Sequence, residues 1–277
     1  MRALVVTADD VGLHSGMTLG SLKAYDEGIV TACSVVANGR HFEPAADLLR
    51  DRPGLDVGVH LTLVGERPLS PAARVPSLVD GSGAFLKDFR AFTRRYLLGG
   101  FAAAEVEEEL RRQIERLQAT GLPLVHANSH QHLHVLPRIF EIVLRLAAEH
   151  RIPFVRIPNE PAARGLSPRS LQIGILNRIG RRARQHLGSA VRATDRTVGV
   201  VAAGGLTVEK LERILADVEG LTELVCHPGL GDRALAQAYN WGYAWEGETA
   251  ALCDPRAREA MGVRGIGLTG FSKRSGL

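Results

Sequence analysis

The apolar positions along the chain alternate between short continuous runs and longer stretches with helical spacing. "ALVVTA" (3–8) is a valine-rich run of the kind found in a strand that is buried on both faces. The most regular helical pattern lies at 103–121, where apolar residues recur every three or four positions, acids crowd the first turns and Gly121 ends the helix. The pattern therefore predicts strands that alternate with helices.

The same pattern continues along most of the chain. Strands are expected at 3–8, 32–38, 55–64, 123–130, 153–158 and 221–229. Helices are expected at 17–30, 43–54, 103–121, 138–151 and 208–220. The stripe of the first helix would be Leu19, Leu22 and Tyr25, and residues 65–104 are expected to form a long loop with one short helix.

Alternating strands and helices are typical of crossover units that build a mainly parallel sheet. With more than five strands, we expect an α/β fold, namely a single irregular TIM-like (β/α) barrel with mainly parallel strands, in one domain over residues 1–277. A doubly wound open sheet is the alternative.

Composition excludes several classes of protein. The chain has 277 residues, of which 45% are hydrophobic and 23% charged, as in an ordinary globular protein with a substantial core. A net charge of +4 and 5% aromatic residues do not favour a nucleic-acid partner. The three cysteines are odd in number and widely spaced, which argues against a disulfide framework and a thiolate zinc cluster. With neither a signal peptide nor a transmembrane run in the pattern, we expect a cytoplasmic protein.

Acids and imidazoles stand where the expected strands end. Asp9 and Asp10 follow the first strand, His60 lies on the third, and His227 ends the last. The fourth strand runs into "HANSHQHLHVLP" (126–137), which holds four of the ten histidines of the chain. Because parallel strands bring their carboxyl ends to one edge of the fold, we expect these groups to converge.

Each of these residues also has a purely structural interpretation. The aspartate pair could cap the following helix, His60 could be a satisfied core histidine, and His227 could simply end a strand. An extended backbone would place His130, His132 and His134 on one face, where a shared cation would relieve their burial. Four strand ends that all carry such groups favour a common site.

The chemistry that these groups suggest is metal-assisted hydrolysis. One carboxylate and two neutral imidazoles leave positions open on a divalent ion for water and a substrate oxygen. Such an ion polarises a carbonyl and acidifies water, while a second carboxylate takes the proton of the water and a histidine protonates the leaving group. Spacing alone does not decide which aspartate has which role.

Several motifs together resemble those of the YdjC-like carbohydrate deacetylase family. They are "TADDVGLHSG" (7–16), "GIVTACSVVANG" (28–39), "GVHLTLVGERPL" (58–69), "HANSHQHLHVLP" (126–137) and "ELVCHPG" (223–229). The likeness runs from residue 1 to about residue 265. Within the family, "VPSLVDGSGAF" (75–85), Asn128 and "FVRIPNEP" (154–161) are most similar to the hopanoid biosynthesis-associated branch, often called HpnK.

The resemblance implies an irregular TIM-like barrel that removes an N-acetyl group from an amino sugar with one bound divalent cation, Mg²⁺ first and Zn²⁺ as the alternative. It implies Asp9 as general base and His227 as general acid. The implied metal ligands are Asp10, His60 and His130, while His132 and His134 would either line the pocket or support the ligands from behind. Arg156 resembles a position that orients Asp9 or binds substrate, whereas its structural interpretation is a solvated surface arginine.

The substrate and partners stay open at this level. An apolar stripe in 171–187 (Leu176, Ile179, Ala183 and Leu187) lies opposite four arginines. This segment is either an interfacial helix that contacts anionic lipid, as a hopanoid-linked substrate would require, or a solvated helix packed on the barrel. Free chitooligosaccharides are the alternative substrate, and a metal phosphoesterase and a sugar-binding protein are alternative functions. Relatives are often dimers, so a homodimer is expected as well.

Overall fold

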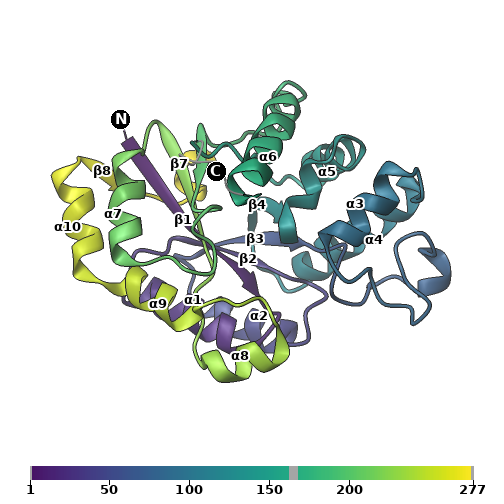
Figure 1. Ribbon diagram of the computed structural model, residues 1–277, viewed down its shortest axis with the longest axis horizontal. Helices are drawn as coiled ribbons and strands as arrows, with labels where there is room; N and C mark the ends of the chain where they lie inside the picture. The colour runs from purple at the N-terminus through teal and green to yellow at the C-terminus, as the bar shows by residue number, and fades with distance from the viewer. Residues whose placement is uncertain (1, 162–167, 276–277) are drawn as a thin grey trace.

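The computed structural model describes residues 2–161 and 168–275, which form an incomplete barrel of parallel strands surrounded by helices (Figure 1). The strands are β1 (Arg2–Val11), β2 (Ala32–Val35), β3 (Asp56–Leu61), β4 (Leu124–Ser129), β5 (Phe154–Val155), β6 (Arg196–Val198), β7 (Leu221–Cys226) and β8 (Ile266–Leu268). They are ordered β5-β4-β3-β2-β1-β7-β6, and β8 also pairs with β1. The prediction of an irregular TIM-like barrel is confirmed.

Every ladder between these strands is parallel. Between β5 and β6 the described residues form no ladder, although isolated bridges join Phe154 to Arg192 and Asn159 to Thr197. The sheet therefore curves into a barrel that is not closed by a ladder between β5 and β6. All the carboxyl ends of the strands point to the same end of the molecule, as expected for a parallel sheet.

The longer helices flank the sheet on opposite sides. They are α1 (Ser15–Asp26), α2 (Phe42–Arg50), α3 (Phe89–Leu97), α4 (Ala103–Gln118), α5 (Pro137–Glu149), α6 (Pro168–Arg184), α7 (Val208–Ala216), α8 (Asp232–Ala238), α9 (Trp245–Cys253) and α10 (Pro255–Val263). Short helical turns lie at η1 (Ala72–Arg74), η2 (His130–Val135) and α11 (Ser272–Ser275). In Figure 1, α7 and α10 lie to the left of β1, while α3 and α6 lie to its right.

The buried strands and the helix stripes make the core. All of β1 after Arg2 is buried, as its apolar sequence predicts. Helix α4 buries the expected stripe, and it also buries Glu109 and Gln113. Glu109 accepts hydrogen bonds from the backbone N–H groups of Leu69 and Ser70, and Gln113 bonds to the backbone of Thr62. These polar contacts hold the loop after β3 on the helix.

Some element boundaries differ from the expectations. Helix α1 ends before the expected residue 30, and Leu19 is exposed, so the predicted stripe is wrong at that position. The buried face of α1 combines Met17 and Leu22 with small residues, and an added Cβ at Gly20 would lie 2.2 Å from the Cα of Gly229. This close approach brings α1 against the loop that follows β7. Strands β6 and β8 were not expected because they are only three residues long.

Candidate active site

A bulge at the end of β1 turns two consecutive carboxylates into the same cavity. Consecutive residues of a regular strand point to opposite faces. The register between β1 and β2 shifts between Ala8 and Val11, and Asp10 has a φ of 66°. This left-handed residue allows Asp9 and Asp10 to line one cavity. The aspartates do not cap α1, because its N-cap is His14, whose Nδ1 accepts from the N–H of Gly16.

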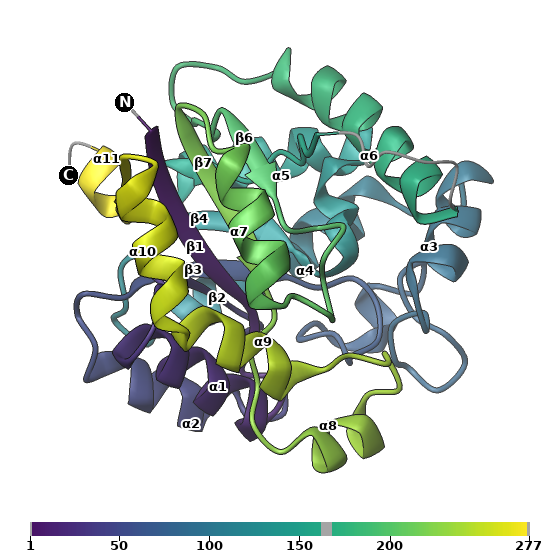
Figure 2. The same ribbon diagram turned by 60° about the vertical axis from the view of Figure 1, so that its left-hand side comes forward.

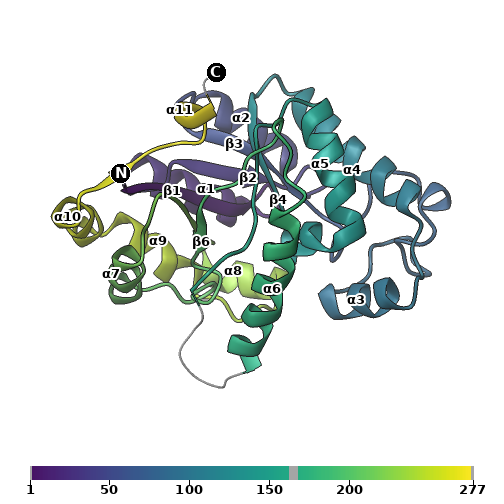
Figure 3. The same ribbon diagram turned by 90° about the horizontal axis from the view of Figure 1, so that it is seen from above.

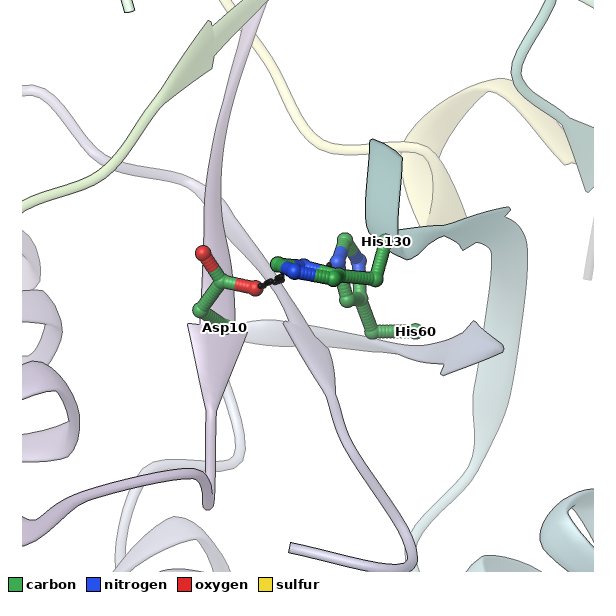
Figure 4. A group of neighbouring side chains, drawn as sticks. All are labelled: Asp10, His60 and His130. Atoms are coloured by element: carbon green, nitrogen blue, oxygen red, sulfur yellow. Dashed lines mark hydrogen bonds and ion pairs between the residues drawn. The ribbon is translucent and has the colours of Figure 1, made fainter. Parts of the chain in front are cut away.

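Asp10, His60 and His130 converge from three separate strand ends (Figure 4). One possible ligand atom from each residue lies within 4.8 Å of the other two. His130 Nδ1 is 2.9 Å and His60 Nε2 is 3.2 Å from the same oxygen of Asp10. A carboxylate and two imidazoles at this spacing fit a single divalent cation. This is the ligand set that the sequence resemblance implies.

The other ring nitrogen of His60 is held by polar groups behind the cluster. Nδ1 of His60 lies 2.7 Å from Oδ1 of Asn128 and 3.0 Å from Oγ of Ser34. Since the amide oxygen can only accept, Nδ1 carries a proton, and Nε2 is the nitrogen that faces the cluster and could bind a cation once it is deprotonated. Metal-binding histidines usually have such a partner.

Asp9 lies beside the cluster in a fully hydrogen-bonded environment. Its Oδ1 accepts from Ser34 at 2.7 Å and from Asn128 at 3.1 Å. Arg156 donates to both carboxylate oxygens, at 2.5 Å and 2.9 Å. Burial by itself would raise the pKa of Asp9, but the charges of Arg156 and His60 outweigh it and hold this pKa well below its usual value. The carboxyl of Asp9 is therefore ionised at neutral pH.

Arg156 is buried beneath the cavity and is not a solvated surface arginine. Besides Asp9 it binds Glu223 of β7, with Nη2 and Nε at 2.8 Å and 3.0 Å from Oε1. Of the two roles that the resemblance implies for Arg156, this geometry is that of orienting Asp9, because its guanidinium already binds two carboxylates and does not line the cavity.

The segment after β4 is a tight helical turn, so the extended backbone that would place His130, His132 and His134 on one face is not present. Gln131 and His132 have φ values of 55° and 56°, which end the alternation of side chains. The ring of His132 lines the cavity. His134 is buried instead, with Nδ1 bonded to Ser129 and Nε2 to the backbone oxygen of Arg156. Both ring nitrogens of His134 therefore have partners within the protein.

His227 reaches the same cavity from the end of β7. Its backbone N–H donates to Glu248 at 2.7 Å, which fixes the loop, and its ring packs edge-on against Tyr243. His227 is thus available on the wall of the cavity that contains Asp9 and the cluster.

The cavity around the cluster has a volume of about 620 Å³ and mostly apolar walls. These walls come from α3 and α6, including Phe89, Ile173, Leu176 and Ile179. A second cavity of about 640 Å³ adjoins it and is lined by charged and polar groups, among them Arg40, Glu66 and Lys87. His130, Gln131 and Trp241 belong to both cavities. The cluster therefore lies where a polar and an apolar space meet.

The aromatic residues that lie where the two cavities meet were not predicted from the sequence. Trp241 packs 5.2 Å from the ring of His130 and 5.7 Å from that of Tyr243. Both tryptophans of the chain and two of its four tyrosines lie in "YNWGYAW" (239–245). This concentration, in a chain poor in aromatic residues, was the signal that could have indicated a binding surface.

Comparison with known proteins agrees with this geometry. The model of the family described as YdjC-like protein matches residues 3–262. This chain belongs to the YdjC-like family. A carbohydrate deacetylase of Brevibacillus brevis is 33% identical over 272 residues, with 98% of each chain covered. A chitooligosaccharide deacetylase of Serratia marcescens is 31% identical over 273 residues, also with 98% of each chain covered.

Solved structures share the YdjC-like fold. A protein of Enterococcus faecalis that is named for cellobiose-phosphate cleavage superimposes with a TM-score of 0.80 over 99% of both chains, at 26% identity. A lactam utilization protein of Thermus thermophilus, at 13% identity and a TM-score of 0.51, covers 98% of this chain and shares the fold alone. Among the described residues, we find no helix both long and apolar enough to cross a bilayer.

Proposed function

We propose that the protein is a metal-dependent hydrolase that removes the N-acetyl group from an acetylated amino sugar. The observation that carries the proposal is the convergence of Asp10, His60 and His130 beside an ionised Asp9, in one cavity. The names of the curated relatives, which are carbohydrate and chitooligosaccharide deacetylases, support this choice of reaction.

Asp10, His60 and His130 would hold the divalent cation, which when bound polarises the acetyl carbonyl and acidifies a water molecule. The family resemblance implies Mg²⁺ first and Zn²⁺ as the alternative; the carboxylate suits either ion, whereas the two imidazoles suit zinc. The buried partners of His60 support this assignment, since they leave its Nε2 free to bind.

Asp9 would act as the general base. Its carboxylate takes a proton from water as the water oxygen attacks the acetyl carbon. Arg156 keeps both oxygens of Asp9 in one orientation throughout. His227 would donate a proton to the amide nitrogen as the C–N bond breaks, which yields acetate and a free amine. The position of His227 in the same cavity supports this assignment.

The two adjoining cavities indicate which kinds of substrate would fit the site. The indole of Trp241 would stack on the sugar ring next to His130, since an aromatic face suits the apolar face of a pyranose. An apolar acceptor, such as a hopanoid that carries the amino sugar, would fit the space walled by α3 and α6. The hydrophilic cavity would suit the next unit of a chitooligosaccharide, which is the alternative substrate.

A phosphoesterase with two cations is less well supported. Such a reaction requires a second group of ligands about 4 Å from the first. In residues 2–161 and 168–275, the cluster of Asp10, His60 and His130 is the group with the spacing for a metal ion.

Acetate release from N-acetylglucosaminyl lipid and from diacetylchitobiose tests the proposal, together with metal analysis of the purified protein. Asp9→Asn is expected to retain the metal and lose turnover, because the amide cannot take a proton. Asp47→Asn, at an exposed position on α2, is the matched control and should retain both. An Asp9→Asn variant with normal turnover would remove Asp9 from the role of base, and no acetate from either substrate would reject the proposed activity.

A further inference from the structure

Exposed apolar side chains gather on two helices that are far apart in the sequence. Seven large apolar side chains are exposed among the described residues, and five of them belong to α3, the residue after it, and α6. Leu97, Leu98 and Leu171 are 75%, 76% and 68% exposed. Ile175 and Phe89 complete the group. Exposed apolar groups that lie together usually mark an interaction surface.

The two helices form one face because they wall the same cavity. Phe89 and Thr93 of α3 and Ile173 and Leu176 of α6 line the apolar space above the metal ligands. Both helices lie on the side of the molecule away from α7 and α10 (Figures 2 and 3). Two of the exposed apolar groups, Phe89 and Ile175, themselves line this cavity. We call the outer side of α3 and α6 the α3/α6 face.

This face differs from the stripe that the sequence indicated. Leu176 and Ile179 face the cavity, while Ala183 and Leu187 pack against the core. The predicted stripe of α6 is thus packed on the barrel. The exposed apolar residues occupy another side of the helix, and α3 adds residues that the sequence did not connect with α6.

The charged residues of the α3/α6 face are all basic. Neither helix contains an acidic residue, and the acid that precedes α3, Asp88, caps its first turn. Arg94, Arg178, Arg181 and Arg182 are exposed and form no ion pair within residues 2–161 and 168–275.

Arginines on α4 and α5 are paired with acids. Arg111 pairs with Glu149 and Arg145 pairs with Glu107. Unpaired arginines also occur on α7 and α8, but those helices carry acids as well. The α3/α6 face is distinguished by basic residues and exposed apolar side chains on two helices without an acid.

We propose that the α3/α6 face docks onto an anionic membrane surface, with the leucines inserted among the lipids and the arginines against their headgroups. Basic and apolar residues on one face are the combination that binds anionic bilayers. A second copy of this chain is a poorer occupant, because face-to-face contact would bring unpaired arginines together. The proposal does not depend on the reaction proposed for the cavity.

Vesicle flotation at low ionic strength tests the docking directly. The wild-type protein should float with vesicles of phosphatidylcholine and phosphatidylglycerol, and much less with phosphatidylcholine alone. Two variants, the triple change Leu97→Glu, Leu98→Glu and Leu171→Glu and the double change Arg181→Glu and Arg182→Glu, should each lower the partition coefficient by about tenfold or more. None of these five residues lines the cavity, so a folded variant is recognised by its unchanged circular dichroism spectrum and metal content.

The controls alter the same kinds of residue elsewhere. Val263→Glu changes an apolar side chain of α10 that is 87% exposed, and Arg213→Glu with Arg233→Glu reverses two exposed charges on α7 and α8. Both controls should bind vesicles as the wild type does, within about twofold. The proposal is overturned by a wild type that does not float, by controls that lose as much binding as the test variants, or by a concentration-dependent dimer that the leucine changes dissociate while flotation persists.

Discussion

Asp9 and Arg156 form a buried ion pair through two hydrogen bonds, with Nη1 2.5 Å from Oδ2 and Nη2 2.9 Å from Oδ1. Two bonds fix the plane of a carboxylate, whereas one would leave it free to turn. The same guanidinium binds Glu223 on β7, so the orientation of Asp9 is tied to the sheet itself.

Two substitutions of Arg156 should separate its role in orienting Asp9 from its contribution to the stability of the fold. Arg156→Lys keeps the charge but loses the two-point contact, so we expect kcat to fall about a hundredfold with KM nearly unchanged. Arg156→Met leaves two buried carboxylates unpaired and should lower the free energy of unfolding by about 3–5 kcal/mol. Arg145→Met, which breaks the exposed pair with Glu107, should cost less than about 1 kcal/mol in the same urea titration. Equal losses from the two methionine variants would contradict the assigned role.

Asn128 contacts both His60 and Asp9, and two substitutions should separate those contacts. Asn128→Ala removes the acceptor for Nδ1 of His60 and should weaken metal binding by about 10–100-fold. Asn128→Asp retains an acceptor for His60 but replaces the donor to Asp9 with a like charge, so metal affinity should hold while kcat falls. Metal titration and acetate release measure the two effects. Loss of metal by both variants alike would show that Asn128 does not act through these separate contacts.

Removal of the metal should destabilise the protein, and this effect should require the cluster of Asp10, His60 and His130. A ligand present at about a hundred times its Kd stabilises the folded state by about 2.7 kcal/mol. Chelation should therefore lower the melting temperature of the wild type. It should have no effect on a His60→Ala and His130→Ala double variant, which lacks two of the three proposed ligands. A chelator effect that persists in the double variant would place the stabilising ion elsewhere.

Trp241 should affect substrate binding more than the chemical step. Trp241→Ala removes the aromatic surface beside His130, so KM should rise about tenfold while kcat changes little. Trp241→Phe should restore most of the affinity because it returns an aromatic face. Kinetics with diacetylchitobiose measure both. A lower kcat at constant KM would mean that the indole positions His130 and does not bind the sugar.

His126 should account for part of the sensitivity to acid. Burial, reinforced by the charge of Arg156, lowers its pKa to about 3. Between the ordinary pKa of about 6.5 and this value, the unfolded chain binds the proton that the folded chain excludes, so stability falls as the pH falls. The contribution of this one group at pH 5 is about 2 kcal/mol.

His126→Phe tests that contribution because neither ring nitrogen of His126 has a partner and its ring stacks on Phe271. The variant should be at least as stable as the wild type at pH 7, and it should lose about 2 kcal/mol less stability between pH 7 and pH 5. Urea unfolding at both pH values gives the difference. Parallel pH profiles for the two proteins would assign the acid sensitivity to other groups.

The sequence by itself determined the longer strands, the main helices and the groups that converge on the site. Valine-rich runs such as that of β1 and the stripe of α4 have a periodicity that depends on local geometry, so it can be read without coordinates. Strand ends indicated the two aspartates and the histidines, because parallel topology gathers such ends together. The family motifs then selected Asp10, His60 and His130 among them.

Tertiary structure alone decided how individual side chains point. Asp9 and Asp10 share a cavity only because Asp10 adopts a left-handed conformation at a bulge, and the turn at Gln131 and His132 ends the alternation that an extended chain would have. Such backbone conformations are strained for these residue types, so local preference does not predict them and the surrounding fold must impose them.

Long-range contacts were likewise beyond the sequence pattern. Arg156 binds Asp9, which is 147 residues away in the sequence, and Glu223, which is 67 residues away. The α3/α6 face likewise joins two helices that only the barrel brings together. Periodicity describes one element at a time, and the packing of elements against each other determines which buried charges meet and which apolar groups are left exposed.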